Sequence, residues 1–523
     1  MIIRIFSFLI WATALTSTIC HAQILTSSNL PIIRVNTSQA EIPDEPKIEG
    51  SIEIIDNGPG NLNSPTDLPS HYQGPIGIEV RGNSTQDFEK KTYAIELRDE
   101  AGNDLSASLL GMGKEEDWIL HAMVIDKSQL RIPYSFYLWQ RMGHYAANWR
   151  YVELILNGEY RGLYILTERI KRDKDRVDIA KLTEADLSGD ALTGGYILRI
   201  DWLDEVQGFE SQYKSQGEVP MFFQWYYPRA DRIQPEQADY IESWMANFEN
   251  ALFAENYRNA RGERYSDLIN LTSFADFLLI NEFSKNSDGY KLSSYIHKDR
   301  DSRGGLLVAG PIWDFDQTYG ISQVCSNDNP RGWTYRQDQE ACEDLESMPL
   351  WWQRMVADSE FRTLLSQRWA SFRSSFLHQD SIYAWIDRHK DLIAPAIERN
   401  FTRWDEMIGE QIWYEPEPLP ESYAEEIAQL KSWIALRLDW MDANLPLISG
   451  EKRDFFRFYP NPTTGPLTLE SPAEINIKVY DLSGRALLQT TDKQLDLSSL
   501  PAGAYVLQLR IEDWQGSELL IKQ

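Results

Sequence analysis

The segment from Asn281 to Gly320 constrains this chain most, because it places two acidic loops on either side of a predicted β-hairpin. The end of an apolar helix leads into a polar loop that holds Asp288. Two short strands, 294–297 and 306–308, follow around a Gly-rich turn, and the second runs into the sequence GPIWDFD at 310–316. Phosphoryl-transfer enzymes of the kinase type need this layout: one Asp orients the attacking hydroxyl, and another holds Mg²⁺ against the ATP phosphates.

Each acidic loop also has a purely structural interpretation. Asp288 stands in Asn-Ser-Asp-Gly, and Asp and Gly are residues that suit turns. In Trp-Asp-Phe-Asp, by contrast, Asp314 and Asp316 occupy alternating positions and share one side of an extended segment. The residues alone therefore leave both interpretations open: Asp288 is a turn residue or a catalytic acid, and Asp314 and Asp316 are structural carboxylates or a pair that acts together.

The rest of the chain up to residue 445 changes from strand patterns to helix patterns. Strands are predicted at 30–36, 51–55, 76–85, 88–97, 152–168 and 194–201, with Asn157-Gly158 as the two-residue turn of a hairpin. Helical spacing of apolar residues is found at 238–255, 273–283, 351–377, 381–401 and 421–445. Asp126 is expected to cap a helix through Tyr137, which Pro133 should kink or split. The pattern predicts an α+β protein with a β-rich N-terminal lobe and a helical C-terminal lobe.

One lysine near the start of a predicted strand attracts attention. Lys91 shares a face with Tyr93, Ile95 and Leu97, and it follows a polar turn. A lysine that pairs with nucleotide phosphates could occupy this position, and so could an ordinary solvated strand end.

The C-terminal region differs in composition from what precedes it. Residues 449–457 are predicted to be a linker. Residues 458–523 contain short alternating strands with turn signals and without a helical pattern, which predicts a small all-β sandwich.

The N-terminus and the charge indicate the compartment and exclude one class of partner. Residues 1–22 have a positive charge, a short apolar core and a small-x-small cleavage site, which is typical of a secretory signal peptide. Lipidation at Cys20 is an alternative; a membrane anchor is disfavoured because the apolar run is too short to span a bilayer. With 51 basic and 79 acidic residues, the net charge of −28 argues against nucleic-acid binding. In an oxidising compartment Cys325 and Cys342 are expected to form a disulfide.

Several ordered blocks resemble the CotH family of secreted, atypical kinase-like proteins first associated with spore coats. The blocks are RGNST at 81–85, KKTYAIEL at 90–97, DKSQLR at 126–131, NGEYRGLYILTERI at 157–170, GGYILRID at 194–201 and GPIWDFD at 310–316. The resemblance covers about residues 28–445. The last residues, which begin with YPNP-x-x-G at 459–465, resemble the C-terminal sorting domain of type IX secretion. This second resemblance implies a Bacteroidetes-type cell and export through the periplasm to the surface or the medium.

The resemblance implies a role for each matching residue. Asp288 would accept or orient the substrate hydroxyl proton, and Asp314, with Asp316 as a further ligand, would bind Mg²⁺ or Mn²⁺. Lys90 or Lys91 would pair with the ATP phosphates, Glu168 would hold that lysine, and Arg81 would contact a phosphate.

The chain departs from ordinary kinases around Asp288. Ser293 stands where an ordinary kinase has the Asn that holds a second metal ion, so Ser293 is the candidate ligand there. Asn286-Ser287 replaces the usual His-Arg, and the chain has no G-x-G-x-x-G loop.

Two functions are therefore in competition. The first is a secreted kinase that transfers the ATP γ-phosphoryl group to a hydroxyl of a secreted or surface protein. The second is a catalytically inactive kinase-like module for adhesion or matrix binding, with the aromatic run 222–227 as its candidate surface. A kinase requires its acids and its phosphate-pairing lysine to converge on one cleft, whereas a binding module does not.

Overall fold

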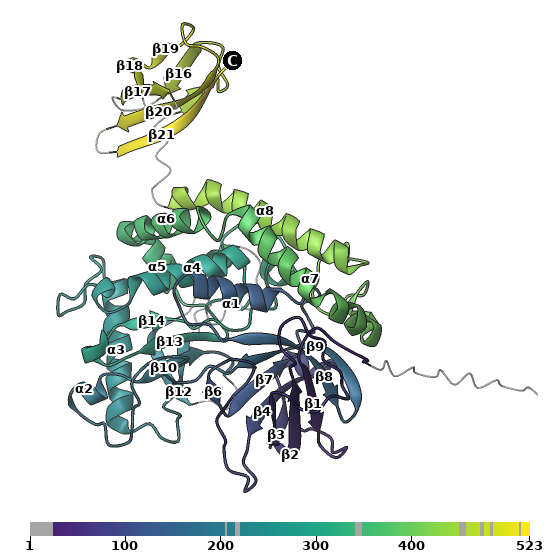
Figure 1. Cartoon of the computed structure of the whole chain (residues 1–523). Helices are drawn as coiled ribbons and strands as arrows, with labels where there is room; N and C mark the ends of the chain where they lie inside the picture. Colours follow the sequence, from purple (N-terminus) through teal and green to yellow (C-terminus); the bar gives the residue numbers. More distant parts are fainter. Residues whose placement is uncertain are drawn as a thin grey trace, which may run out of the picture. The chain divides into compact units, whose positions relative to one another are not determined.

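The computed structural model describes residues 25–203, 207–214, 220–339, 348–448, 457–470, 475–481, 485–511 and 514–523 (Figure 1). The predicted signal peptide, nearly all of the predicted linker and Cys342 lie outside the described residues. The pairing of Cys325 with Cys342 therefore stays a prediction. By its internal contacts the chain divides into two compact units, 1–357 with 367–441, and 358–366 with 442–523.

The N-terminal strands form a closed barrel in the order β1-β2-β3-β4-β7-β9-β8. Its strands are β1 (Ile32–Asn36), β2 (Ile48–Ile55), β3 (Tyr72–Arg81), β4 (Thr92–Leu97), β7 (Asp117–His121), β8 (Trp149–Leu156) and β9 (Glu159–Glu168). The predicted hairpin is confirmed, because β8 and β9 pair across Asn157 and Gly158, which have φ angles of 52° and 84° as a tight turn requires. Closure comes from parallel pairing of β1 with β8, in which Ile32 lies opposite Glu153.

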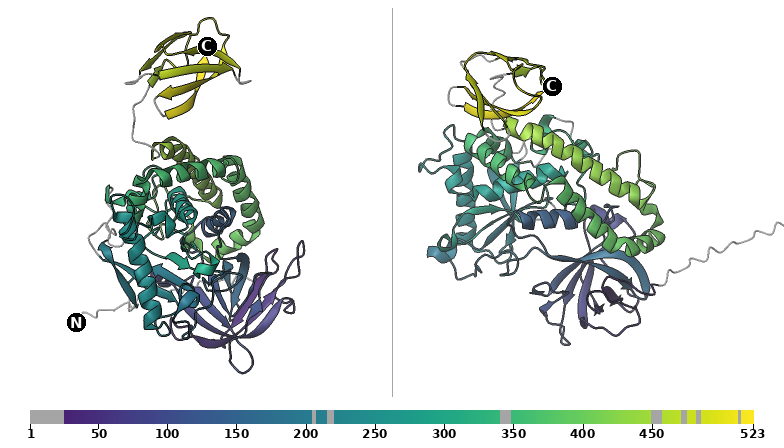
Figure 2. Two further views of the ribbon diagram at one scale, coloured as in Figure 1. Left: turned by 90° about the vertical axis from the view of Figure 1, so that its left-hand side faces the viewer. Right: turned by 45° about the horizontal axis from the view of Figure 1, so that its top comes forward.

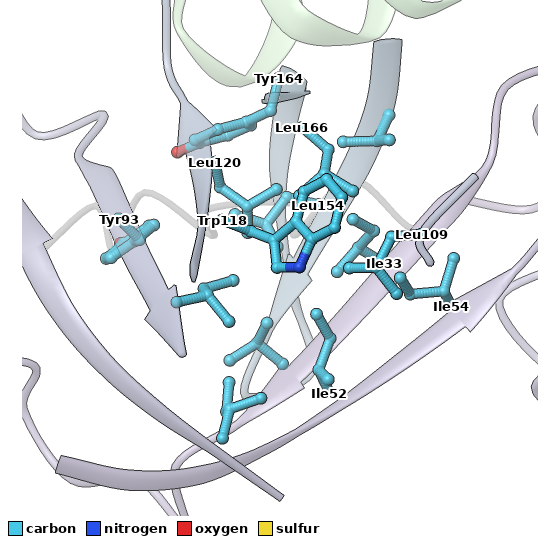
Figure 3. Close-up of a cluster of buried hydrophobic side chains, with 14 of the residues drawn as sticks. Ile33, Ile52, Ile54, Tyr93, Leu109, Trp118, Leu120, Leu154, Tyr164 and Leu166 are labelled. Atoms are coloured by element: carbon cyan, nitrogen blue, oxygen red, sulfur yellow. The ribbon is translucent and has the colours of Figure 1, made fainter. Parts of the chain in front are cut away.

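Large apolar side chains fill the barrel (Figure 3). Trp118 lies among isoleucines and leucines from the surrounding strands and is 1% exposed. Its indole Nε1 donates to the Glu115 carbonyl at 3.0 Å, so the one polar atom of this ring is satisfied. A strand that alternates apolar and polar residues buries one face here, and closure leaves the barrel without edge strands.

The hairpin predicted between the two acidic loops is confirmed, and it belongs to a second sheet. That antiparallel sheet has the order β11-β12-β10-β13-β14, with β10 (Tyr196–Ile200), β11 (Gly208–Lys214), β12 (Pro220–Tyr227), β13 (Ser294–Lys298) and β14 (Leu307–Ala309). Strand β13 begins shortly after Asp288, and β14 ends just before Gly310. The sheet thereby fixes the starting points of both acidic loops.

Helices make up most of the remainder of the chain up to residue 448. They are α1 (Arg131–Arg141), α2 (Gly189–Leu192), α3 (Pro235–Phe253), α4 (Leu271–Ser284), α5 (Trp351–Ala357), α6 (Ser359–Arg373), α7 (Gln379–Arg403) and α8 (Tyr423–Ile448). Short 3-10 helices are η1 (Ser84–Asp87), η2 (Tyr265–Asp267), η3 (Asp301–Arg303), η4 (Val324–Ser326), η5 (Thr334–Gln339) and η7 (Asp405–Met407), and the strands β5 (Ala107–Ser108) and β6 (Lys114–Glu115) form a small hairpin. Helix α4 is capped by the Asn270 side chain and is apolar nearly all round, so most of its side chains are buried. Helix α7 lies against β9 of the barrel (Figure 2).

The helix expected to start at Asp126 starts at Arg131 instead. The Asp126 carboxylate accepts from the backbone N–H groups of Ser128 at 3.0 Å and Arg131 at 2.7 Å, so it closes a loop before the helix. Pro133 falls in the first turn of α1, where a backbone N–H has no helical partner to lose, and it neither kinks nor splits the helix.

The second unit contains two sheets in its described residues. One has the order β15-β16-β19 and the other β18-β17-β20-β21. The strands are β15 (Arg457–Tyr459), β16 (Pro466–Glu470), β17 (Ile475–Asp481), β18 (Ala486–Thr490), β19 (Gln494–Asp496), β20 (Gly503–Ile511) and β21 (Trp514–Lys522). Both sheets contribute to one apolar core that includes Leu467, Ile477 and Leu507.

In the described parts of the chain, no helix is both long and apolar enough to cross a membrane.

Candidate active site

A cavity of about 470 Å³ collects most of the acidic residues singled out in the sequence. Asp288, Ser293, Asp314 and Asp316 line it from the two loops around the β13–β14 hairpin. Arg81 lines it from the end of β3 in the barrel, so residues far apart in the sequence meet there.

The backbone around Asp288 is held on both sides. Helix α4 ends at Ser284. The next residue, Lys285, has a φ angle of 45° and donates through Nζ to three backbone carbonyls of the 326–331 segment. The Asn286 side chain accepts from the backbone N–H of Asp288 at 3.1 Å. At Gly289 a Cβ atom would lie 2.6 Å from Asn281 Oδ1, so no larger residue fits without a shift. These contacts fix where the Asp288 side chain leaves the loop.

Asp314 and Ser293 both adopt backbone conformations that are unusual for residues with a side chain. Their φ angles are 62° and 44°. The Ser293 hydroxyl donates to Asp314 Oδ2 at 3.3 Å, which links the two acidic loops directly. Left-handed conformations of such residues cost free energy and gather at functional sites.

The carboxylates of the cavity repel one another. The pKa of Asp314 is raised to about 6, mainly by burial and in addition by the negative charge of Asp201. The pKa of Asp316 is raised well above its usual range, mainly by burial and in addition by the negative charges of Asp314 and Asp288. A cation placed among these acids would offset both the burial and the repulsion.

The donor set suits a divalent cation. Oxygen atoms of Asp314 and Asp316 and a ring nitrogen of His121 all lie within 4.8 Å of one another. Carboxylate oxygens are the ligands that Mg²⁺ prefers. The Nδ1 atom of His121 already accepts from the backbone N–H of Met123 at 3.0 Å, so in the neutral ring Nε2 carries the hydrogen. The two aspartates are therefore the residues of this group best suited to hold a divalent cation.

A second acidic group, at 115–117, is already paired with a lysine. The Lys171 ammonium lies 2.8 Å from Glu115, 2.7 Å from Glu116 and 2.9 Å from Asp117. A protein cation thus occupies the position where a metal ion would bind.

The expected pairing of a phosphate-binding lysine with Glu168 differs from what the structure shows. Lys90 is buried, donates to the Leu163 carbonyl at 2.8 Å and lies over the Tyr164 ring. The Lys91 ammonium donates to the Gln86 carbonyl.

Glu168 lies at the end of β9 and has other partners. It accepts from the backbone N–H and side-chain amide of Asn148 and from the Tyr145 hydroxyl, and its ion-pair partner is Arg176 at 3.5 Å. Neither lysine lines the cavity; among the described cavity residues the cationic side chains are Arg81 and Arg199. Arg199 is paired with Asp201 at 3.3 Å, so Arg81 is the better placed to meet a phosphate.

The aromatic run considered as a binding surface is partly packed into the protein. Phe223 is fully buried and stacks on Trp351 with ring centres 5.5 Å apart. Tyr226 and Tyr227 pack against an internal cluster around Ile197. The remaining aromatics of the run, Phe222, Trp225, Tyr226 and Tyr227, are half-buried, so its use as a binding surface stays a prediction.

Sequence reasoning missed several residues of the cavity. Asp201 ends the block GGYILRID and Gln317 directly follows GPIWDFD, so both could have been found from their neighbours. His121 and Trp413 also line the cavity, but no local pattern marks either of them.

Two family models match this chain. The family model described as CotH kinase protein matches residues 78–441, which include every cavity residue named above. The model described as secretion system C-terminal sorting domain matches residues 457–523. A search of curated proteins finds no match. The first model covers well over half of this chain, so the chain belongs to the CotH kinase protein family, and it carries a C-terminal secretion sorting domain.

Proposed function

We propose that this protein is a secreted atypical kinase that uses ATP with Mg²⁺ or Mn²⁺ to phosphorylate a hydroxyl group of a secreted or cell-surface protein. One observation carries the proposal: Asp288, Asp314 and Asp316 converge with Ser293 and Arg81 on a single cavity. This convergence meets the requirement for the acids, and Arg81 supplies the cation that neither lysine brings to the cavity; catalysis at such a site consists mainly of positioning and charge neutralisation.

Each cavity residue then has a distinct task. Asp314 and Asp316 would hold the divalent cation, with the Ser293 hydroxyl beside them, and the cation would neutralise charge on the transferring phosphoryl group. Arg81 would contact a phosphate oxygen. Asp288 takes the proton of the acceptor hydroxyl while the acceptor oxygen bonds to the γ-phosphorus and the bond to ADP breaks.

The sorting domain supports the proposed location. Proteins with such a domain are exported, so we assign this chain to the cell surface or the medium after passage through the periplasm, with the type IX secretion machinery as its partner. The predicted signal peptide would start that route.

A catalytically inactive binding module is the second candidate. The observation in its favour is that Lys90 and Glu168 are held by other groups, so the lysine–glutamate pair of ordinary kinases is missing here. Under this hypothesis the acids would be remnants without nucleotide affinity.

Thermal unfolding of the mature chain with ATP and either metal separates the two candidates. A ligand that binds only the folded state stabilises it, by about 2.7 kcal/mol at a hundred times its Kd. Metal-dependent stabilisation should be lost in Asp314→Ala and kept in the exposed control Asp231→Ala. Asp288→Ala should keep the stabilisation and lose phosphoryl transfer. No shift at millimolar ATP with either metal would refute the kinase proposal.

A further inference from the structure

We infer that Gln317 is a positioning residue for Asp288 and that Trp413 fixes the orientation of the Gln317 amide. The inference rests on the proposed function, since it assigns Asp288 the role of proton acceptor. It concerns a hydrogen-bonded chain that runs from the segment between α7 and α8 to the acidic loops.

The contacts of Gln317 connect the two acidic loops. Its side-chain Nε2 donates to Asp288 Oδ2 at 3.4 Å, and its backbone N–H donates to Asp316 Oδ1 at 3.0 Å. The Gln317 backbone carbonyl also accepts from the Ser287 hydroxyl at 3.5 Å. One residue therefore contacts both the proposed proton acceptor and a proposed metal ligand. The 3.4 Å contact is long, as catalytic hydrogen bonds often are before substrate binds.

Trp413 determines which way the Gln317 amide points. The Trp413 indole Nε1 donates to Gln317 Oε1 at 2.8 Å, and the Ser322 hydroxyl donates to the same oxygen at 3.4 Å. An indole N–H can only donate, so the amide oxygen must face Trp413 and the NH₂ group must face Asp288. Without that donor the amide could turn its oxygen toward the carboxylate, and the two would repel each other.

Trp413 is itself held by a motif that the proposed mechanism does not otherwise use. The backbone N–H of Trp413 donates to Glu415 Oε2 at 2.8 Å, and the other oxygen of Glu415 pairs with Lys127 at 3.1 Å. Lys127 is fully buried and belongs to the block DKSQLR; its ammonium also donates to the Glu410 carbonyl at 2.6 Å. The Trp413 ring lies 5.9 Å from that of Phe88, just before β4. These contacts keep the indole in place over Gln317.

The expected effect follows from how strongly phosphoryl transfer depends on placement. A catalytic group displaced by about 1 Å can lose on the order of 100-fold in rate. Removing the amide or its orienting donor should therefore lower kcat by about 10- to 100-fold. The KM for ATP should stay unchanged, because neither side chain is assigned to the nucleotide.

A double-mutant cycle on the full mature chain tests the inference. Gln317→Ala and Trp413→Phe should each lower kcat, and the double variant should be no slower than Gln317→Ala alone, because Trp413 acts through Gln317. Trp149→Phe, which changes a tryptophan of the barrel, should leave kcat unchanged. Losses that multiply in the double variant, or an unchanged kcat in either single variant, would overturn the inference.

An NMR measurement tests the hydrogen bond independently of activity. The indole N–H signal of Trp413, identified by its loss in Trp413→Phe, should move upfield in Gln317→Ala and stay in place in the Trp149→Phe control. An unmoved signal contradicts the inference. A wild-type protein that neither binds ATP nor transfers phosphate would instead refute the proposed function, and with it the role of Asp288. If the wild type is active but the kcat losses of the two single variants multiply in the double variant, only the positioning role of Gln317 is refuted.

Discussion

Glu249 offers a quantitative test of how burial controls charge in this fold. It lies in α3, is 1% exposed, and accepts from the Ser211 hydroxyl at 2.8 Å and from the Trp351 indole at 2.9 Å. Both donors are neutral. Burial raises the pKa of Glu249 from 4.5 to about 7, and the two hydrogen bonds only partly oppose it.

The size and sign of the effect on stability follow from these two pKa values. Between pH 4.5 and 7 the folded protein holds a proton on Glu249 that the unfolded chain has released. The free energy of unfolding therefore falls as pH rises through this window, by roughly 3 kcal/mol at about 1.4 kcal/mol per pH unit, and is level above it.

Glu249→Gln should remove this pH dependence, because the amide is neutral throughout. We expect the variant and the wild type to differ little near pH 5, and the variant to be more stable by roughly 3 kcal/mol at pH 8. Urea unfolding at several pH values measures the difference. Glu236→Gln, at an exposed position of the same helix, is the control and should show no such trend. A difference between wild type and Glu249→Gln that does not change with pH would refute the reasoning.

Three further predictions concern the loops and the barrel. Gly310→Ala should lower the free energy of unfolding by several kcal/mol and abolish ATP-dependent stabilisation, because Gly310 has a φ angle of 101° and the new Cβ would lie 2.8 Å from Trp139. Gly304→Ala is the control: Gly304 has a φ angle of 109° but lies in open space, so the same thermal scan should show a loss of only about 1 kcal/mol. Lys90→Met should leave the ATP-dependent rise in melting temperature intact, because the buried Lys90 ammonium bonds to the Leu163 carbonyl. Loss of that rise would show that Lys90 pairs with the ATP phosphates after all. Arg131→Met should lower the free energy of unfolding by about 3–5 kcal/mol in urea, since it leaves two buried carboxylates unpaired, and a neutral result would contradict that account.

Features that depend on neighbours in sequence could be predicted well. Asn157-Gly158 allows a tight turn at positive φ, so the β8–β9 hairpin followed from two residues. The acids at 288, 314 and 316 flank one short hairpin, and a hairpin of this length leaves little freedom in where its two ends lie. Their meeting in one cavity was therefore within reach of the sequence.

Features that depend on distant partners could not be predicted in the same way. Lys90 was assigned by analogy with ordinary kinases, but in this chain its ammonium is satisfied by the Leu163 carbonyl inside the protein. Trp413 meets Gln317 from a loop with no local pattern. The second sheet joins β10 to the β13–β14 hairpin, and nothing near either segment in the sequence specifies that pairing.

The parallel pairing that closes the barrel also determines when the barrel can fold. Strand β1 is the first strand of the described chain, yet its neighbour on one side is β8. Ile32 can therefore pair with Glu153 only after the intervening strands of the barrel have been made. Contacts between segments so far apart form slowly, because a long loop must be ordered before they contribute. Until β8 is in place, β1 can pair only with β2, its neighbour on the other side. Barrel closure is therefore expected to be a late folding step, and the outer edge of β1 stays unpaired until β8 has formed.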